Sequence, residues 1–231
     1  MGMAESAPGL YPPMHSLIQR RTLLFMPLLA QAAPVTPEVW NFDRLDRIGG
    51  HPTTLLGKPK LIDTPGGKAV EFDGVEDAIF LDVHPLAGAE AFTWEVIFRP
   101  ASGGQPEQRF FHLQETGSIH RLLLETRLMG DQWCLDSFAA SSTGQQALMD
   151  RKLLHPLDQW HHVAFVSDGT QMRHYVNNKL ELNANVKLAP QAAGKTSVGV
   201  RINRVDYFKG AIRTARFTRE ALDPTHFLPV P

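Results

Sequence analysis

The sequence predicts an all-β protein, a jelly-roll β-sandwich of two antiparallel sheets. Most of the chain consists of short runs in which apolar and polar residues alternate, which is typical of strands with one buried face. Turn-forming pairs such as Asp168-Gly169 separate these runs. Only one short helical turn is expected, near the end, where Asp223 is a suitable N-cap and Pro224 a suitable first helical residue. Many short strands with almost no helix indicate a sandwich or jelly roll.

The first 33 residues are predicted to be an export signal rather than part of the fold. Arg20-Arg21 precedes the short apolar run Thr22–Ala30, and Ala30-Gln31-Ala32 fits the small-x-small cleavage rule. The folded domain is therefore predicted over residues 34–231. The apolar run has about half the length that a membrane-spanning helix needs, so no stable membrane span is expected. We expect a secreted or periplasmic protein, exported through an ordinary secretory signal or a twin-arginine signal.

The segment Phe92–Phe98 shows the strand pattern most clearly. Phe92, Trp94, Val96 and Phe98 share one face, and Thr93, Glu95 and Ile97 share the other. A loop rich in proline and glycine follows. Further strands are predicted, in order, at Arg109–Gln114, His120–Arg127, Gln132–Ala139, Trp160–Ser167, Met172–Asn177, Thr196–Val200 and Phe208–Thr218. Asn177-Asn178 is expected to form a tight turn, because asparagine tolerates a positive φ better than most residues.

Composition limits the functional classes. The chain has 231 residues, of which 43% are hydrophobic and 20% charged, as expected for one globular domain with a leader. A formal net charge of −1 gives no basic excess for nucleic acid, so no nucleic-acid partner is expected. The single cysteine, Cys134, excludes an intrachain disulfide and is expected to be a small core residue.

Nine short pieces, taken in order, carry a family resemblance. They are Trp40–Asp43, Ala69–Gly74, Asp77–Leu81, Phe92–Glu95, Trp160–Ala164, Tyr175–Asn177, Gly210–Ile212, Arg216–Phe217 and Arg219–Leu222. This ordered set resembles the laminin-G-like domains of the concanavalin A-like lectin/glucanase superfamily. The resemblance implies the jelly-roll fold, with Trp160 as a core aromatic and His162 hydrogen-bonded to backbone at the start of a strand.

The resemblance also bears on calcium. Members of the family often have aspartates after Gly-x-Ile that help to hold calcium, whereas this chain has Arg213-Thr214 there. Arginine cannot ligate a hard cation, which prefers oxygen ligands, so the usual calcium site is not expected and no cofactor is predicted. Asp43, Asp73 and Asp77 are the remaining oxygen donors for calcium.

Two motifs raise the alternative of a polysaccharide-cleaving enzyme. Glu71-x-Asp73-x-x-Glu76 matches the pattern of retaining glucanases of this broad fold, but Gly74-Val75 indicates a turn where that motif needs a continuous strand. Tyr207-Phe208-Lys209 resembles the last motif of jelly-roll alginate lyases. The pieces around His120 and Arg127 follow each other in the reverse of the lyase order.

A glycan site needs an exposed aromatic ring beside hydrogen-bonding side chains. Trp133, next to Asp136, is the best candidate ring, and its alternative role is core packing. His120 and Arg127 are expected to share its face. We therefore predict a secreted, non-catalytic module that binds a carbohydrate or an extracellular protein partner. The alternative is a glycoside hydrolase or lyase on the same fold.

Overall fold

The computed structural model describes residues 1–3, 9 and 36–231. The predicted export signal falls almost wholly outside these residues. The strands all belong to the compact unit formed by Val35–Pro231. Nothing helical in the described part of the chain is long and apolar enough to cross a membrane.

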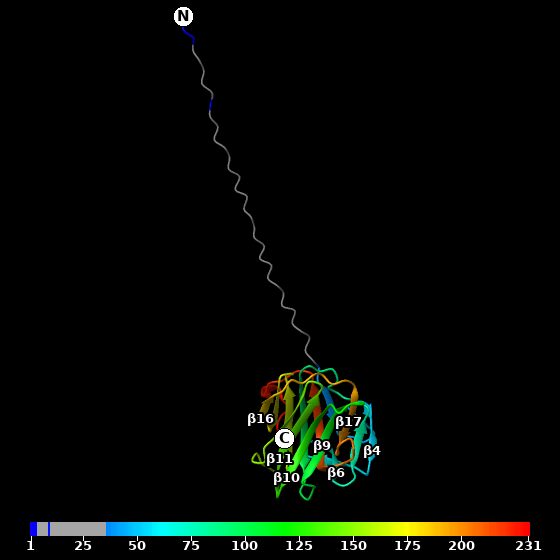
Figure 1. The fold of residues 1–231 in the computed structure, drawn as a ribbon. Helices are drawn as coiled ribbons and strands as arrows, with labels where there is room; N and C mark the ends of the chain where they lie inside the picture. Colours follow the sequence, from blue (N-terminus) through cyan, green and yellow to red (C-terminus); the bar gives the residue numbers. More distant parts are fainter. Residues whose placement is uncertain (4–8, 10–35) are drawn as a thin grey trace. The chain divides into compact units, whose positions relative to one another are not determined.

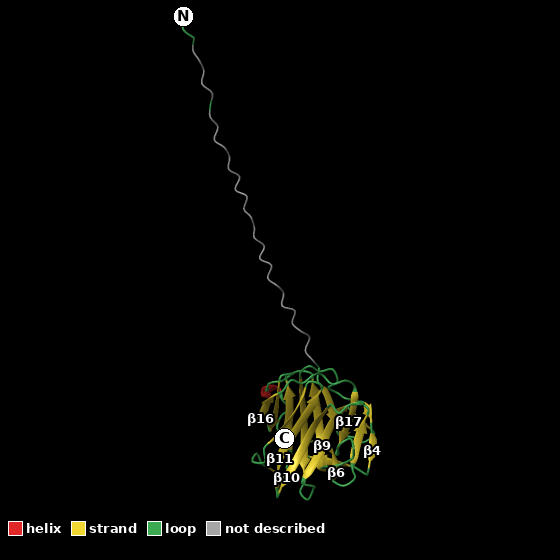
Figure 2. Ribbon diagram, viewed as in Figure 1, coloured by secondary structure: helices red, strands yellow, loops and turns green. Residues whose placement is uncertain are grey.

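Two large antiparallel sheets form the two layers of a sandwich (Figures 1 and 2), which confirms the predicted fold class. Sheet I has the strand order β16-β15-β14-β8-β18-β6-β5, and β1 pairs with β18. Its strands are β16 (Lys179–Asn185), β15 (Gln171–Val176), β14 (His161–Ser167), β8 (Phe92–Pro100), β18 (Lys209–Thr218), β6 (Gly67–Asp73), β5 (Lys60–Thr64) and β1 (Glu38–Asn41).

Sheet II has the order β12-β11-β10-β9-β17-β7-β4, and β13 pairs with β11. Its strands are β12 (Gly144–Met149), β11 (Gln132–Ser141), β10 (Arg121–Met129), β9 (Glu107–Glu115), β17 (Gly194–Val198), β7 (Ala78–Leu81), β4 (Thr54–Leu56) and β13 (His155–Pro156). A small hairpin joins β2 (Arg47–Ile48) to β3 (His51–Pro52). The predicted helical turn is a 3₁₀ turn, η1 (Pro224–His226), capped by Asp223.

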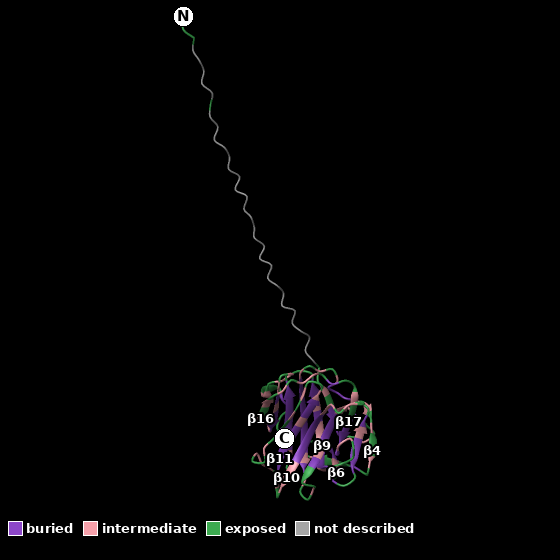
Figure 3. Cartoon of the chain, in the orientation of Figure 1, coloured by how far each residue is buried: buried purple, intermediate pink, exposed green. Residues whose placement is uncertain are grey.

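Buried residues lie along the strands of the sandwich (Figure 3), and residues from both sheets form one hydrophobic core cluster. The predicted inner face of β8 is confirmed, because Phe92, Trp94, Val96 and Phe98 all lie in the core cluster. The Phe98 and Phe110 rings stack with their centroids 4.3 Å apart. Cys134 is buried and free, as predicted. The Asn177-Asn178 turn is also confirmed, with φ of 49° and 62°.

The outer face of β8 is buried as well, which the alternation alone does not predict. Residues 219–228, which we call the strap, cross this face and close a second apolar cluster of Ala164, Val166, Tyr175 and Phe227. Beneath the strap the fully buried carboxylate of Glu95 accepts hydrogen bonds from His162 Nε2 at 3.0 Å, Arg216 Nε at 2.5 Å and the Leu228 amide at 2.6 Å. The His162 side chain therefore bonds a carboxylate rather than the expected backbone group.

Trp160 is not the core aromatic that the family resemblance implies. It lies immediately before β14 and is partly exposed. His161 is paired with Phe98 and points inward, so the preceding residue faces the outside of sheet I.

Candidate functional site

Trp133 does not supply an exposed ring, so its predicted role as a sugar-stacking platform is wrong. Its side chain is fully buried, and its ring packs edge-on against Phe98 with centroids 5.1 Å apart. Asp136 follows three residues later on the same strand. Residues separated by an odd number lie on opposite faces of a strand, so Asp136 faces outward while Trp133 faces the core.

His120 also does not join the other predicted site residues. It precedes β10, where its ring nitrogen Nδ1 lies 3.3 Å from a Glu115 carboxylate oxygen. Arg127 is near the other end of β10, about 20 Å away along an extended strand. His120 and Arg127 therefore do not come together in one site, as the prediction required.

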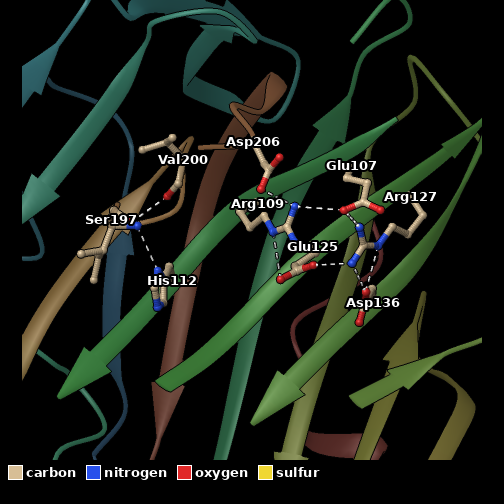
Figure 4. A network of polar contacts seen from close by, with 10 residues as sticks. Glu107, Arg109, His112, Glu125, Arg127, Asp136, Ser197, Val200 and Asp206 are labelled. Carbon is tan, nitrogen blue, oxygen red and sulfur yellow. Dashed lines mark hydrogen bonds and ion pairs between the residues drawn. The ribbon is translucent and has the colours of Figure 1, made fainter. Parts of the chain in front are cut away.

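Arg127 and Asp136 do come together, on the outer face of sheet II. Arg127 donates from Nε and Nη2 to Asp136 Oδ2 at 2.9 and 2.6 Å, and the same Nη2 lies 2.9 Å from Glu125 Oε2. Figure 4 shows that this pair belongs to a larger network, which we call the ion-pair network; its members are Glu107, Arg109, Glu125, Arg127, Asp136 and Asp206.

Strand alternation and register build this network. Leu122 and Leu124 of β10 lie in the core, so Arg121, Glu125 and Arg127 face outward. Pairing then places Glu125 opposite Arg109 on β9 and opposite Asp136 on β11. Nε of Arg109 lies 3.1 Å from Glu125 Oε1, and its Nη1 lies 2.5 Å from Asp206 Oδ2.

A bulge in β9 brings Arg109 into register with Glu125. The pairing of β10 with β9 shifts by one residue between Leu124 and Glu125. The extra residue allows the adjacent Phe110 and Phe111 both to enter the core, and Arg109 still faces outward beside Glu125.

Burial makes Glu125 the unusual acid of the network. Only 3% of the residue is exposed, and this burial, reinforced by the neighbouring charge of Asp136, raises the pKa of Glu125 to about 7 against the opposing effect of Arg109 and Arg127. Glu107, at the exposed edge, behaves differently. A hydrogen bond from Arg127 lowers its pKa.

A pocket of about 200 Å³ lies over the network; its lining includes Arg109, Arg121, Glu125, Arg127, Asp136, Phe138 and Arg201. The Arg121 guanidinium stacks 4.6 Å from the Phe138 ring centroid. Within residues 36–231, Arg121 and Arg201 form no ion pair, and burial lowers the pKa of Arg121. The pocket thus offers fixed hydrogen-bonding groups, an aromatic ring and two unneutralised cations. Sequence reasoning missed Arg121 and Phe138, although their outward positions could have been found by counting residues along each strand.

The calcium candidates do not form one site. Asp73 Oδ1 accepts the amides of Val75, Glu76 and Asp77 at 2.8 to 3.0 Å. The two oxygens of Asp77 accept the amides of Lys58 and Asp73. These carboxylates hold the turn between β6 and β7, and no group of three or more metal-ligating side chains, with or without Asp43, occurs in the described part of the chain.

The glucanase-like motif is interrupted, as its glycine suggests. β6 ends at Asp73, and Gly74 follows with φ of 78°. Glu76 therefore lies on a turn, while Glu71 lies on the strand and forms an ion pair with Arg99 at 3.4 Å. The continuous strand that this motif requires is not present at these residues.

Comparison with known proteins agrees with the fold. A family model described as the concanavalin A-like lectin/glucanases superfamily matches residues 73–226. Domain 4 of AbnA, a GH43 extracellular arabinanase from Geobacillus stearothermophilus solved in complex with arabinotriose, has a TM-score of 0.62 and 20% identity, and the match covers 81% of this chain and 94% of that chain.

Two toxin domains show the same architecture. The binding domain of botulinum neurotoxin DC, in complex with SialylT, has a TM-score of 0.61 and 12% identity, and the match covers 82% of this chain and 49% of that one. The binding domain of Paraclostridial Mosquitocidal Protein 1 has a TM-score of 0.62 and 9% identity, over 82% and 50%. The chain therefore spans about half the length of these toxin domains. No curated protein matches the sequence.

Proposed function

The chain belongs to a laminin G-type family of the concanavalin A-like lectin/glucanases superfamily, and on that premise we propose that it is a non-catalytic carbohydrate-binding module. The proposed site is the pocket over the ion-pair network on sheet II. We further propose that the leader, residues 1–33, directs export, so that the module meets its glycan in the periplasm or outside the cell.

The pocket itself is the observation that carries this proposal. Carboxylate and guanidinium groups fixed in ion pairs can accept from and donate to neighbouring sugar hydroxyls with little loss of side-chain freedom. Arg121 and the Phe138 ring add a cation and an apolar surface beside them. Sugars present this combination of hydroxyl groups and C–H faces.

Structural neighbours support the same class of ligand. One neighbour is solved with arabinotriose and another with SialylT.

A glycan array tests the proposal, with residues 34–231 applied as wild type, Arg121→Ala and Arg173→Ala. Arg121 forms no ion pair, so its removal should leave the network folded. Arg173 is the matched control, an arginine on sheet I paired with Asp168 at 3.2 Å. We expect selective, saturable binding that Arg121→Ala weakens and Arg173→Ala retains. A blank array, or equal signals from all three proteins, would overturn the proposal.

One observation favours glycoside hydrolysis as a second candidate. Glu125 and Asp136 lie side by side, bridged by one nitrogen of Arg127, and Glu125 has a pKa of about 7. A raised-pKa acid beside a second carboxylate is the pair that glycosidases use. Incubation of array hits with wild type and Glu125→Gln distinguishes the two functions. New reducing ends from wild type alone would establish hydrolysis, whereas intact glycans support binding.

A further inference from the structure

A second group of cations surrounds Trp160 on the outer face of sheet I, on the other side of the sandwich from the pocket described above. Two guanidinium groups lie over the indole ring: the Cζ atoms of Arg99 and Arg213 are 5.7 and 5.2 Å from its centroid. Arg213 is the extra residue of a bulge in β18, where the pairing with β8 shifts between Ile212 and Thr214. Ile212 lies in the core, so Arg213 faces outward as Arg99 does, and the bulge leaves Arg213 without a partner residue on β8.

The guanidinium groups of Arg99 and Arg213 have few hydrogen-bond and ion-pair partners. Within residues 36–231 the Arg213 side chain forms no ion pair or side-chain hydrogen bond, and burial lowers its pKa. Arg99 meets Glu71 only at 3.4 Å, and its buried Nε has no hydrogen-bond partner. A partly desolvated cation without a partner is costly, so binding an anion here would recover free energy.

Glu71, which pairs with Arg99, also lines a pocket of about 390 Å³. The rest of its lining includes Lys58, Lys60, Asp73, Glu76, Asp77 and Lys209. The Asp73 and Asp77 oxygens already accept backbone amides, and Glu71 faces Arg99. None of the three lysines forms an ion pair in the described part of the chain. Neutral amides do not cancel the charge of a carboxylate, so the three lysines face four carboxylates and this pocket has no excess of positive charge. It offers donors and acceptors to a sugar, while the cationic part of the site is the pair Arg99 and Arg213.

From these contacts we propose a second, independent binding site for an acidic saccharide. The carboxylate or sulfate of one sugar is held by Arg99 and Arg213 beside Trp160. The adjoining sugar occupies the pocket lined by Lys60 and Lys209. Guanidinium groups suit this role because their planar N–H groups match the oxygens of both anions.

Trp160 provides the readout. The other three tryptophans, Trp40, Trp94 and Trp133, are fully buried, so quenching of fluorescence by iodide should report on Trp160. The probes are trigalacturonate as the carboxylate, a chondroitin sulfate tetrasaccharide as the sulfate, and galactotriose as the neutral control. We expect at least one acidic probe to bind saturably, to protect the indole from iodide and to lose affinity as salt rises.

Arg213→Gln should lower the affinity for the acidic probe about tenfold or more, because the anion loses a charged hydrogen-bond donor. Arg173→Gln, on the same sheet face, should bind as wild type does. Arg99→Gln serves as the second variant if Arg213→Gln does not fold. Binding of galactotriose equal to that of the acidic probes, absence of saturable binding by both acidic probes, or wild-type affinity of the arginine variant would overturn the proposal.

Discussion

Glu125 should make the stability of this protein depend on pH in a direction opposite to that of an ordinary surface acid. Its pKa is about 7 in the folded protein, against an ordinary value of 4.5. Between these two pH values, Glu125 is therefore protonated in the folded state and ionised in the unfolded chain. This stabilisation is fully present below pH 4.5 and is lost as the pH rises through 7. The two values predict that Glu125 makes the protein about 2.5 kcal/mol more stable at about pH 5 than at about pH 8.

Urea unfolding of wild type and Glu125→Gln at these two pH values measures this contribution. The glutamine cannot titrate, so the wild-type protein should lose about 2.5 kcal/mol more than the variant between about pH 5 and about pH 8. Glu107→Gln is the matched control, because Glu107 contacts the same arginine but is half-exposed with a lowered pKa. Parallel pH profiles for wild type and Glu125→Gln would show that Glu125 is already ionised at about pH 5, and would refute this account of the network.

Four further outcomes follow from the contacts. Arg127→Met leaves two buried carboxylates without their shared partner and should cost about 3–5 kcal/mol in urea unfolding. Glu95→Gln should cost a similar amount, about 3–5 kcal/mol, by weakening the attachment of the strap, and faster proteolysis of the C-terminal residues should accompany the loss. Trp133→Ala should lower stability by about 3–5 kcal/mol, while glycan affinity at subdenaturing temperature should hold. A chelator should leave the melting temperature unchanged, because Asp73 and Asp77 bond backbone amides; a drop of several degrees would contradict this.

Strand positions could be predicted because alternation directly records which face is buried. The pattern Phe92, Trp94, Val96, Phe98 placed four residues in the core correctly. The same counting, applied to β11, would have separated Trp133 from Asp136. That error came from treating neighbours in sequence as neighbours in space.

Other features depend on contacts that no local pattern contains. The alternation of residues in β8 places Glu95 on the outer face and predicts that it is exposed. The strap, which lies far away in the sequence, covers this face and buries Glu95. The bulges at Phe110 and Arg213 change the face of every residue beyond them in the count. Trp160 fits the family pattern of a core aromatic, yet its position one residue before β14 places it outside.

The most direct test of the proposed glycan site is to map the bound ligand by NMR. A hit from the array, titrated into ¹⁵N-labelled residues 34–231, should shift the amides of β9, β10 and β11 around Arg121, Arg127 and Phe138. If the hit is a neutral glycan, shifts confined to the strap, to the turn between β6 and β7, or to other surfaces away from sheet II would contradict the account.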